Sequence, residues 1–114
     1  MRTAAEEKAI RDAAFEAEYG YKDYRDEFPE VVPVVRYGLE NYTRLPKKAQ
    51  GFPDVWEGRE GQIWFPELRY TASPEFVYET LQEAVAASRK AIAKEQANID
   101  ARVATLEALA NSES

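Results

Sequence analysis

The sequence contains no cysteine and no histidine among its 114 residues. The absence of cysteine excludes disulfides and thiolate metal sites. Without histidine the chain also lacks the commonest general base and the commonest metal ligand. We therefore expect a non-enzymatic protein that holds no cofactor and no metal ion.

Long apolar runs and excess basic charge are also missing. The longest apolar run, from Val31 to Val35, is interrupted by Pro33 and is far too short to cross a bilayer. The first seven residues carry no apolar segment typical of a signal peptide, so we expect a cytoplasmic protein without membrane contact. The net charge of −6 disfavours direct binding to nucleic acid and favours a basic protein as the partner.

Glycine and proline are absent from residues 75–114, and no aromatic residue follows Tyr78. This composition predicts a helix from Pro74 to about Ala110, roughly 55 Å long at 1.5 Å per residue. A compact domain of this chain length is only about 35 Å across. The helix is therefore expected either to bend or to project and bind something outside its own domain.

The remaining composition predicts one domain, residues 1–114, made of three segments. They are an acidic N-terminal helix (3–28), an aromatic middle with a hairpin (29–72) and a long helix (73–111). Residues 6–30 hold nine acidic and four basic residues, a net charge of −5, and all fourteen aromatic residues lie between Phe15 and Tyr78. The expected fold class is mainly α within an α+β arrangement.

Local signals support the N-terminal helix and leave the next segment open. Thr3 and Glu6 have capping-box spacing, and Gly20 is a natural helix stop, although the tyrosine spacing also permits helical structure as far as Phe28. The β-branched run at Val31–Val35 is compatible with an edge strand. We favour the other interpretation, a short middle helix that begins at Pro33 and ends near Leu45.

A β-hairpin is expected in the tryptophan-containing segment. Residues 55–57 and 62–65 flank Gly58–Arg59–Glu60–Gly61, a four-residue connection with glycine at each end. Because a lone hairpin is only marginally stable in water, we expect Trp56 and Trp64 to pack into the core. The alternative is that they form an exposed anchor or a groove for a partner.

The acidic, tyrosine-rich stretch at residues 16–30 is the first candidate interaction surface. Tyrosine is enriched at interfaces, and carboxylates attract basic partners. We predict a protein-binding inhibitor or regulator that occupies a basic surface. Such an inhibitor could be a phage-like mimic of nucleic acid. Asp12 and Glu16 lie about 6 Å apart along a helix, which is comparable to the spacing of phosphates. The ordinary alternative is a solvated helix face whose tyrosines cover the core edge. The predicted contact residues are Tyr21, Asp23, Tyr24, Asp26, Glu27 and Glu30.

The second candidate surface is a heptad row in the long helix. Its members are Val85, Ile92, Ile99 and Leu106. The other core position of each heptad is polar in the middle, at Ser88, Glu95 and Arg102. This pattern favours an antiparallel coiled-coil homodimer, in which a two-fold axis between residues 98 and 99 brings Glu95 near Arg102 of the other copy. Alternatively, the row simply packs on the first helix and the hairpin.

Overall fold

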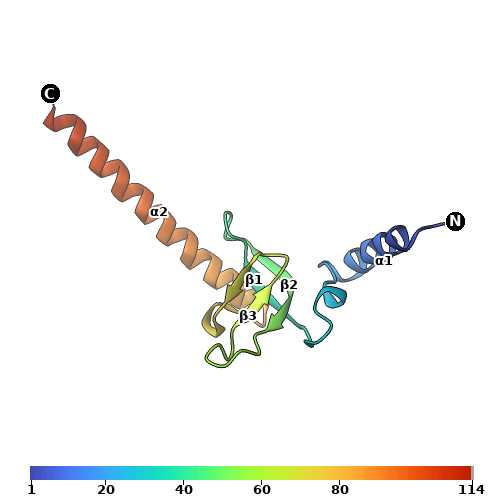
Figure 1. Ribbon diagram of the computed structural model, residues 1–114. Coiled ribbons are helices and arrows are strands. Elements are labelled where there is room, and N and C mark those ends of the chain that lie inside the picture. Colours follow the sequence, from blue (N-terminus) through green and yellow to red (C-terminus); the bar gives the residue numbers. More distant parts are fainter. Residues whose placement is uncertain (114) are drawn as a thin grey trace.

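The computed structural model describes residues 1–113 as a small sheet with a helix extending from each side (Figure 1). The antiparallel sheet has the order β1-β2-β3-β4. The strands are β1 (Val34–Leu39), β2 (Pro46–Pro53), β3 (Ile63–Phe65) and β4 (Tyr70–Ala72). The helices are α1 (Ala4–Tyr19) and α2 (Leu81–Ser112), and two 3₁₀ turns are η1 (Arg25–Glu27) and η2 (Pro74–Phe76). With 19% strand and 48% helix, the fold is a mixture of the two types, which corrects the expectation of a mainly helical protein.

The predicted middle helix is wrong, because its residues form the edge strand β1. Val34 pairs with Gly51 and Leu39 pairs with Pro46, so the β-branched run joins a ladder instead of a helix. Pro33 precedes the strand, where its missing N–H removes no ladder bond. Helical structure in the middle of the chain is limited to the 3₁₀ turns.

The hairpin exists, but its first strand lies earlier in the chain than predicted. β2 pairs with β3 through Phe52–Trp64 and Pro53–Ile63, and residues 54–62 form the connection. Trp56 lies in this connection and is 74% exposed, so its expected place in the core is wrong. Trp64 is half-buried in β3. The glycines at both ends of the predicted turn adopt positive φ, 87° at Gly58 and 85° at Gly61.

The core is small and lies against the sheet. Ala49, Phe65, Leu68 and Ala72 form the buried cluster, with partly buried Ile63, Tyr70 and Val77 packed around it. Backbone bonds between Tyr37 and Tyr78, 2.8 and 3.0 Å long, hold the segment before α2 alongside β1. This contact determines where α2 leaves the sheet.

α1 is a short helix that stands away from the core. The Thr3 hydroxyl accepts from the Glu6 amide at 3.1 Å, as the capping box predicts. Gly20 ends the helix with φ of 80°, and its N–H donates to the Glu16 carbonyl at 2.8 Å. The helix therefore does not continue to Phe28, and none of its residues is buried.

α2 is unbroken over 32 residues, which corresponds to about 48 Å. It begins at Leu81, capped by Thr80, because Pro74 opens the separate turn η2 instead. Only its first turns contact the sheet. Ala84 and Ser88 are buried, the Ser88 hydroxyl donates to the Arg44 carbonyl, and Arg44 Nε contacts Glu95 Oε1 at 2.7 Å. Residues 96–113 are all exposed.

The overall shape is elongated. The principal extents are 73 × 39 × 26 Å, and the radius of gyration is 19.8 Å. A compact domain of similar length has a radius of gyration of about 13 Å. In Figure 1, α2 leaves the sheet in one direction and α1 lies on the other side. No helix within residues 1–113 is both long and apolar enough to cross a membrane.

Candidate interaction surfaces

The exposed half of α2 carries a continuous apolar row, which we call the distal row (Ile92, Ile99, Val103 and Leu106). Their exposed fractions are 44%, 43%, 46% and 65%. At 100° per residue these four side chains lie within about 60° of one another around the helix. Val85, the first member of the predicted heptad row, is half-buried instead. The structure thus leaves the distal row uncovered by its own chain.

Charged side chains flank the distal row on both sides. From helical periodicity, Glu95 and Arg102 lie on one flank, and Arg89, Asp100 and Glu107 lie on the other. Lys90 lies on the opposite face of the helix. Two of the polar heptad positions already have contacts within the chain, since Ser88 is buried against the sheet and Glu95 contacts Arg44. The uncovered part of α2 therefore begins beyond Ser88.

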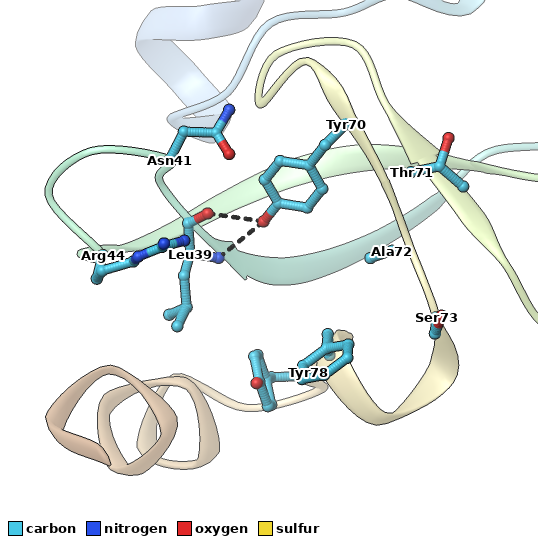
Figure 2. A pocket seen from close by; sticks show the side chains of 9 residues that line it. Leu39, Asn41, Arg44, Tyr70, Thr71, Ala72, Ser73 and Tyr78 are labelled. Carbon is cyan, nitrogen blue, oxygen red and sulfur yellow. Dashed lines mark hydrogen bonds between the residues drawn. The ribbon is translucent and has the colours of Figure 1, made fainter. Parts of the chain in front are cut away.

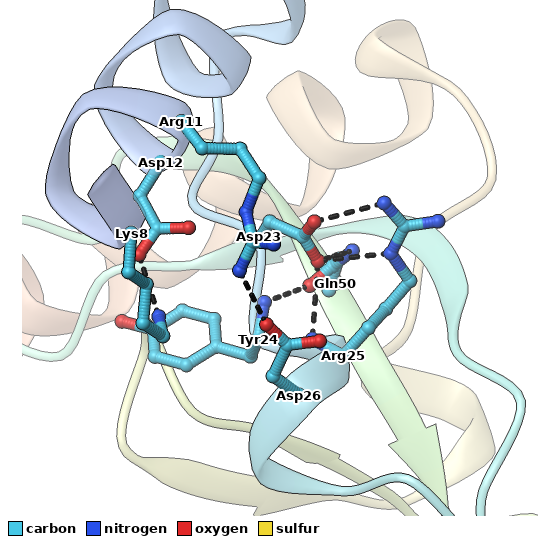
Figure 3. A network of polar contacts seen from close by, with 8 residues as sticks. All are labelled: Lys8, Arg11, Asp12, Asp23, Tyr24, Arg25, Asp26 and Gln50. Carbon is cyan, nitrogen blue, oxygen red and sulfur yellow. Dashed lines mark hydrogen bonds and ion pairs between the residues drawn. The ribbon is translucent and has the colours of Figure 1, made fainter. Parts of the chain in front are cut away.

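Asp23 lies at the centre of a polar network that ties residues 23–26 to β2 (Figure 3). Its carboxylate accepts from Arg25 Nε at 3.0 Å and Arg25 Nη2 at 2.9 Å, and from Gln50 Nε2 at 3.2 Å. These bonds, above all those from Arg25, lower the pKa of Asp23 to about 2. Gln50 is buried, and its Oε1 accepts from the backbone N–H of Tyr24. Asp23 therefore stabilises the attachment of the segment after α1 to β2.

Tyr24 is held in a second internal contact. Its hydroxyl donates to Glu67 Oε2 at 2.7 Å, while Lys47 Nζ donates to Glu67 Oε1 at 2.9 Å. Burial and the bond to Glu67 raise the pKa of Tyr24 above its ordinary value. Burial alone would raise the pKa of Glu67, but the bonds from Tyr24 and Lys47 outweigh it and lower that pKa.

The other predicted contact residues of the acidic stretch divide between internal and free positions. Asp26 pairs with Arg11 of α1 at 2.7 Å, an exposed contact. Tyr21 is half-buried between Phe15, whose ring centroid is 5.5 Å away, and Lys48 at 5.9 Å. Glu27 and Glu30 are exposed, and within residues 1–113 their side chains make no hydrogen bond or ion pair. The structure thus places these six residues in one region of the chain but leaves only the last two without an internal partner.

A groove lies between the sheet and the segment that leads into α2. A cavity of about 390 Å³ is lined by Leu39, Asn41, Arg44, Tyr70, Thr71, Ala72, Ser73, Phe76 and Tyr78 (Figure 2). Tyr70 closes one wall, because its hydroxyl donates to the Leu39 carbonyl at 2.7 Å and accepts from the Leu39 N–H at 3.0 Å. Burial raises the pKa of Tyr70 and of Tyr78, so both phenols stay protonated at neutral pH. The polar part of the groove lining therefore consists of neutral phenols, the Asn41 amide, the Thr71 and Ser73 hydroxyls and the Arg44 cation.

Sequence reasoning missed the residues that anchor these surfaces. Gln50, Glu67 and Arg44 each bond to a residue far away in the chain. Glutamine within a strand of buried residues is the one available signal, since a buried amide needs partners. For Glu67 and Arg44 the sequence gives no such signal.

Comparison with known protein families, curated protein sequences and solved structures gives no match to this chain. Within residues 1–113, no group of three or more acidic side chains is arranged to hold a metal ion.

Proposed function

We propose that this protein is a non-enzymatic protein-interaction module whose main contact surface is the distal row of α2. The observation that carries the proposal is the exposure of Ile92, Ile99, Val103 and Leu106 on a helix that has left the sheet. Each large aliphatic side chain gains about 1.5–3 kcal/mol on full burial, so covering this row favours association. The lack of histidine and cysteine supports the non-enzymatic part of the proposal.

Mutation of the distal row tests the proposal. Ile99→Asp with Leu106→Asp places charge in the row, whereas Ala97→Asp with Ala104→Asp makes the same kind of change on the opposite face. Tagged full-length chains are expressed in the native host beside an untagged copy, and the captured proteins are identified by mass spectrometry.

We expect the native chain to retain at least one protein, its own untagged copy included, which the distal-row variant loses and the opposite-face variant keeps. Equal capture by all three chains would contradict the proposal. Circular dichroism of the purified variants establishes that each one is folded.

A second candidate function is the binding of a basic protein by the acidic N-terminal region. Three of its four basic residues are paired internally, as Lys8–Asp12, Arg11–Asp26 and Arg25–Asp23. Exposed carboxylates such as Glu16, Glu18, Glu27 and Glu30 remain in excess. Because Asp23 and Tyr24 hold the fold, charge reversal at Glu27 and Glu30 is the cleaner test. Loss of capture of a basic partner with the fold intact would support this function, and unchanged capture would remove it.

A further inference from the structure

We infer that the occupant of the distal row is the distal row of a second copy, packed antiparallel about a two-fold axis beside Asn98. The inference rests on the proposed function and names its partner. The charges that flank the row argue for it, because their order along the helix becomes complementary only in one orientation.

Antiparallel pairing brings together residues that lie equally far from Asn98 on opposite sides. A two-fold axis perpendicular to both helices keeps each flank facing the same flank of the other copy. On one flank, Arg89 is then level with Glu107, and Gln96 is level with Asp100. On the other flank, Glu95 lies within about one residue rise of Arg102. Every charged pair across the seam joins opposite charges or a charge and an amide, which favours this pairing.

The apolar residues agree with the same register. Ile92 of one helix lies level with the space between Val103 and Leu106 of the other, and the two Ile99 side chains meet near the axis. The overlap covers residues 89–107, about three heptads, and leaves Ser88 in its own contact with Arg44. Arg44 contacts Glu95 through Oε1, so Oε2 of Glu95 can accept from Arg102 of the second copy.

A parallel pair is less favourable on electrostatic grounds. In parallel helices one flank faces the opposite flank of the partner, which sets Glu95 of one copy against Asp100 of the other and Arg102 against Glu107. The first of these contacts joins like charges, which repel, and only the second joins opposite charges, whereas the antiparallel pair has no like-charge contact. The antiparallel pair also places the two sheets at opposite ends of the rod, because each α2 carries its sheet only at its start (Figure 1).

A charge exchange tests this register in the full-length chain. Arg89 and Glu107 lie about 27 Å apart on one straight helix and cannot contact each other within a chain. Sedimentation equilibrium over a concentration series gives the dimer dissociation constant. Arg89→Glu should weaken the dimer about tenfold, since it sets like charges together at both symmetric contacts. Adding Glu107→Arg to that variant should restore the native value.

The matched control is Lys90→Glu, which changes the same charge on the opposite face and should leave the dissociation constant unchanged. A double variant that stays as weak as Arg89→Glu would overturn the antiparallel register. A native chain that is monomeric at every concentration would overturn self-association itself. In that last case, capture in the host that still depends on the distal row would leave the proposed function standing with a different partner.

Discussion

At the scale of single residues, the acidic stretch contains two kinds of carboxylate with different roles. Asp23 is fixed by Arg25 and Gln50, and its side chain is only 17% exposed. Glu27 and Glu30 are exposed to solvent. An acidic segment therefore contains both carboxylates that stabilise the fold and carboxylates that are accessible to a partner. Composition alone does not distinguish the two kinds.

The low pKa of Asp23 predicts an acid-dependent loss of stability. The pKa is about 2 in the folded chain, below the ordinary value of 3.8. Protonation is therefore easier in the unfolded chain, so the stabilisation by this carboxylate is complete above about pH 4 and is lost as the pH falls towards 2. Asp23→Asn should cost about 1 kcal/mol of the free energy of unfolding at pH 7. The variant should also lose part of the acid dependence, as urea unfolding at several pH values would show.

Glu57→Gln serves as the control, because it removes one exposed carboxylate from the connection between β2 and β3 and should leave stability nearly unchanged. Parallel stability curves for the native chain and Asp23→Asn from pH 7 to pH 2 would refute the role assigned to Asp23.

At the scale of elements, local capping signals were predictable and tertiary pairing was not. The Thr3 cap and the Gly20 stop follow from side-chain chemistry within a few residues, and both appear in the structure. The segment after Pro33 has helical spacing and β-branched residues at once. Pairing of Val34–Leu39 with the next strand, β2, decided between them. No local pattern reveals that β2 begins at Pro46, because Lys47–Gly51 lacks the usual alternation of apolar and polar residues.

Gly38 in β1 lies where the structure leaves no space for a larger side chain. A Cβ atom there would lie 2.5 Å from Leu68 Cδ1 and 2.6 Å from the Tyr70 hydroxyl. Gly38→Ala should therefore destabilise the fold by about 1–3 kcal/mol, because Leu68 is buried and Tyr70 is held by Leu39. Thermal or urea unfolding measures the change. Thr71→Ala, on the exposed part of β4, should stay within about 0.5 kcal/mol of the native chain. A Gly38→Ala variant as stable as that control would show that the close packing is wrong.

The two candidate surfaces also differ in how far the sequence predicts them. The distal row was readable from sequence, since three of its members recur every seven residues in a helix free of glycine and proline. Val85 shares that spacing but is half-buried, which only the tertiary structure reveals. The free and paired carboxylates of residues 16–30 also required the structure, because their partners Gln50 and Arg11 come from β2 and α1.

At the scale of the whole molecule, the central feature is that α2 extends well beyond the sheet and the core of its own chain. The small sheet covers the first turns of α2 and leaves the remainder in solvent. The proposed partner binding and the antiparallel pairing both follow from this shape, since a helix folded back on the sheet would hide the distal row.

Small-angle X-ray scattering over a concentration series measures this shape most directly. Extrapolated to infinite dilution, the single chain should have a radius of gyration close to 19.8 Å and a longest dimension near 73 Å. Both values should rise with concentration as the rods of two chains pair. A radius of gyration near the 13 Å or so of a compact domain, unchanged at every concentration, would mean that α2 lies folded against its own chain and that no projecting rod exists to bind a partner.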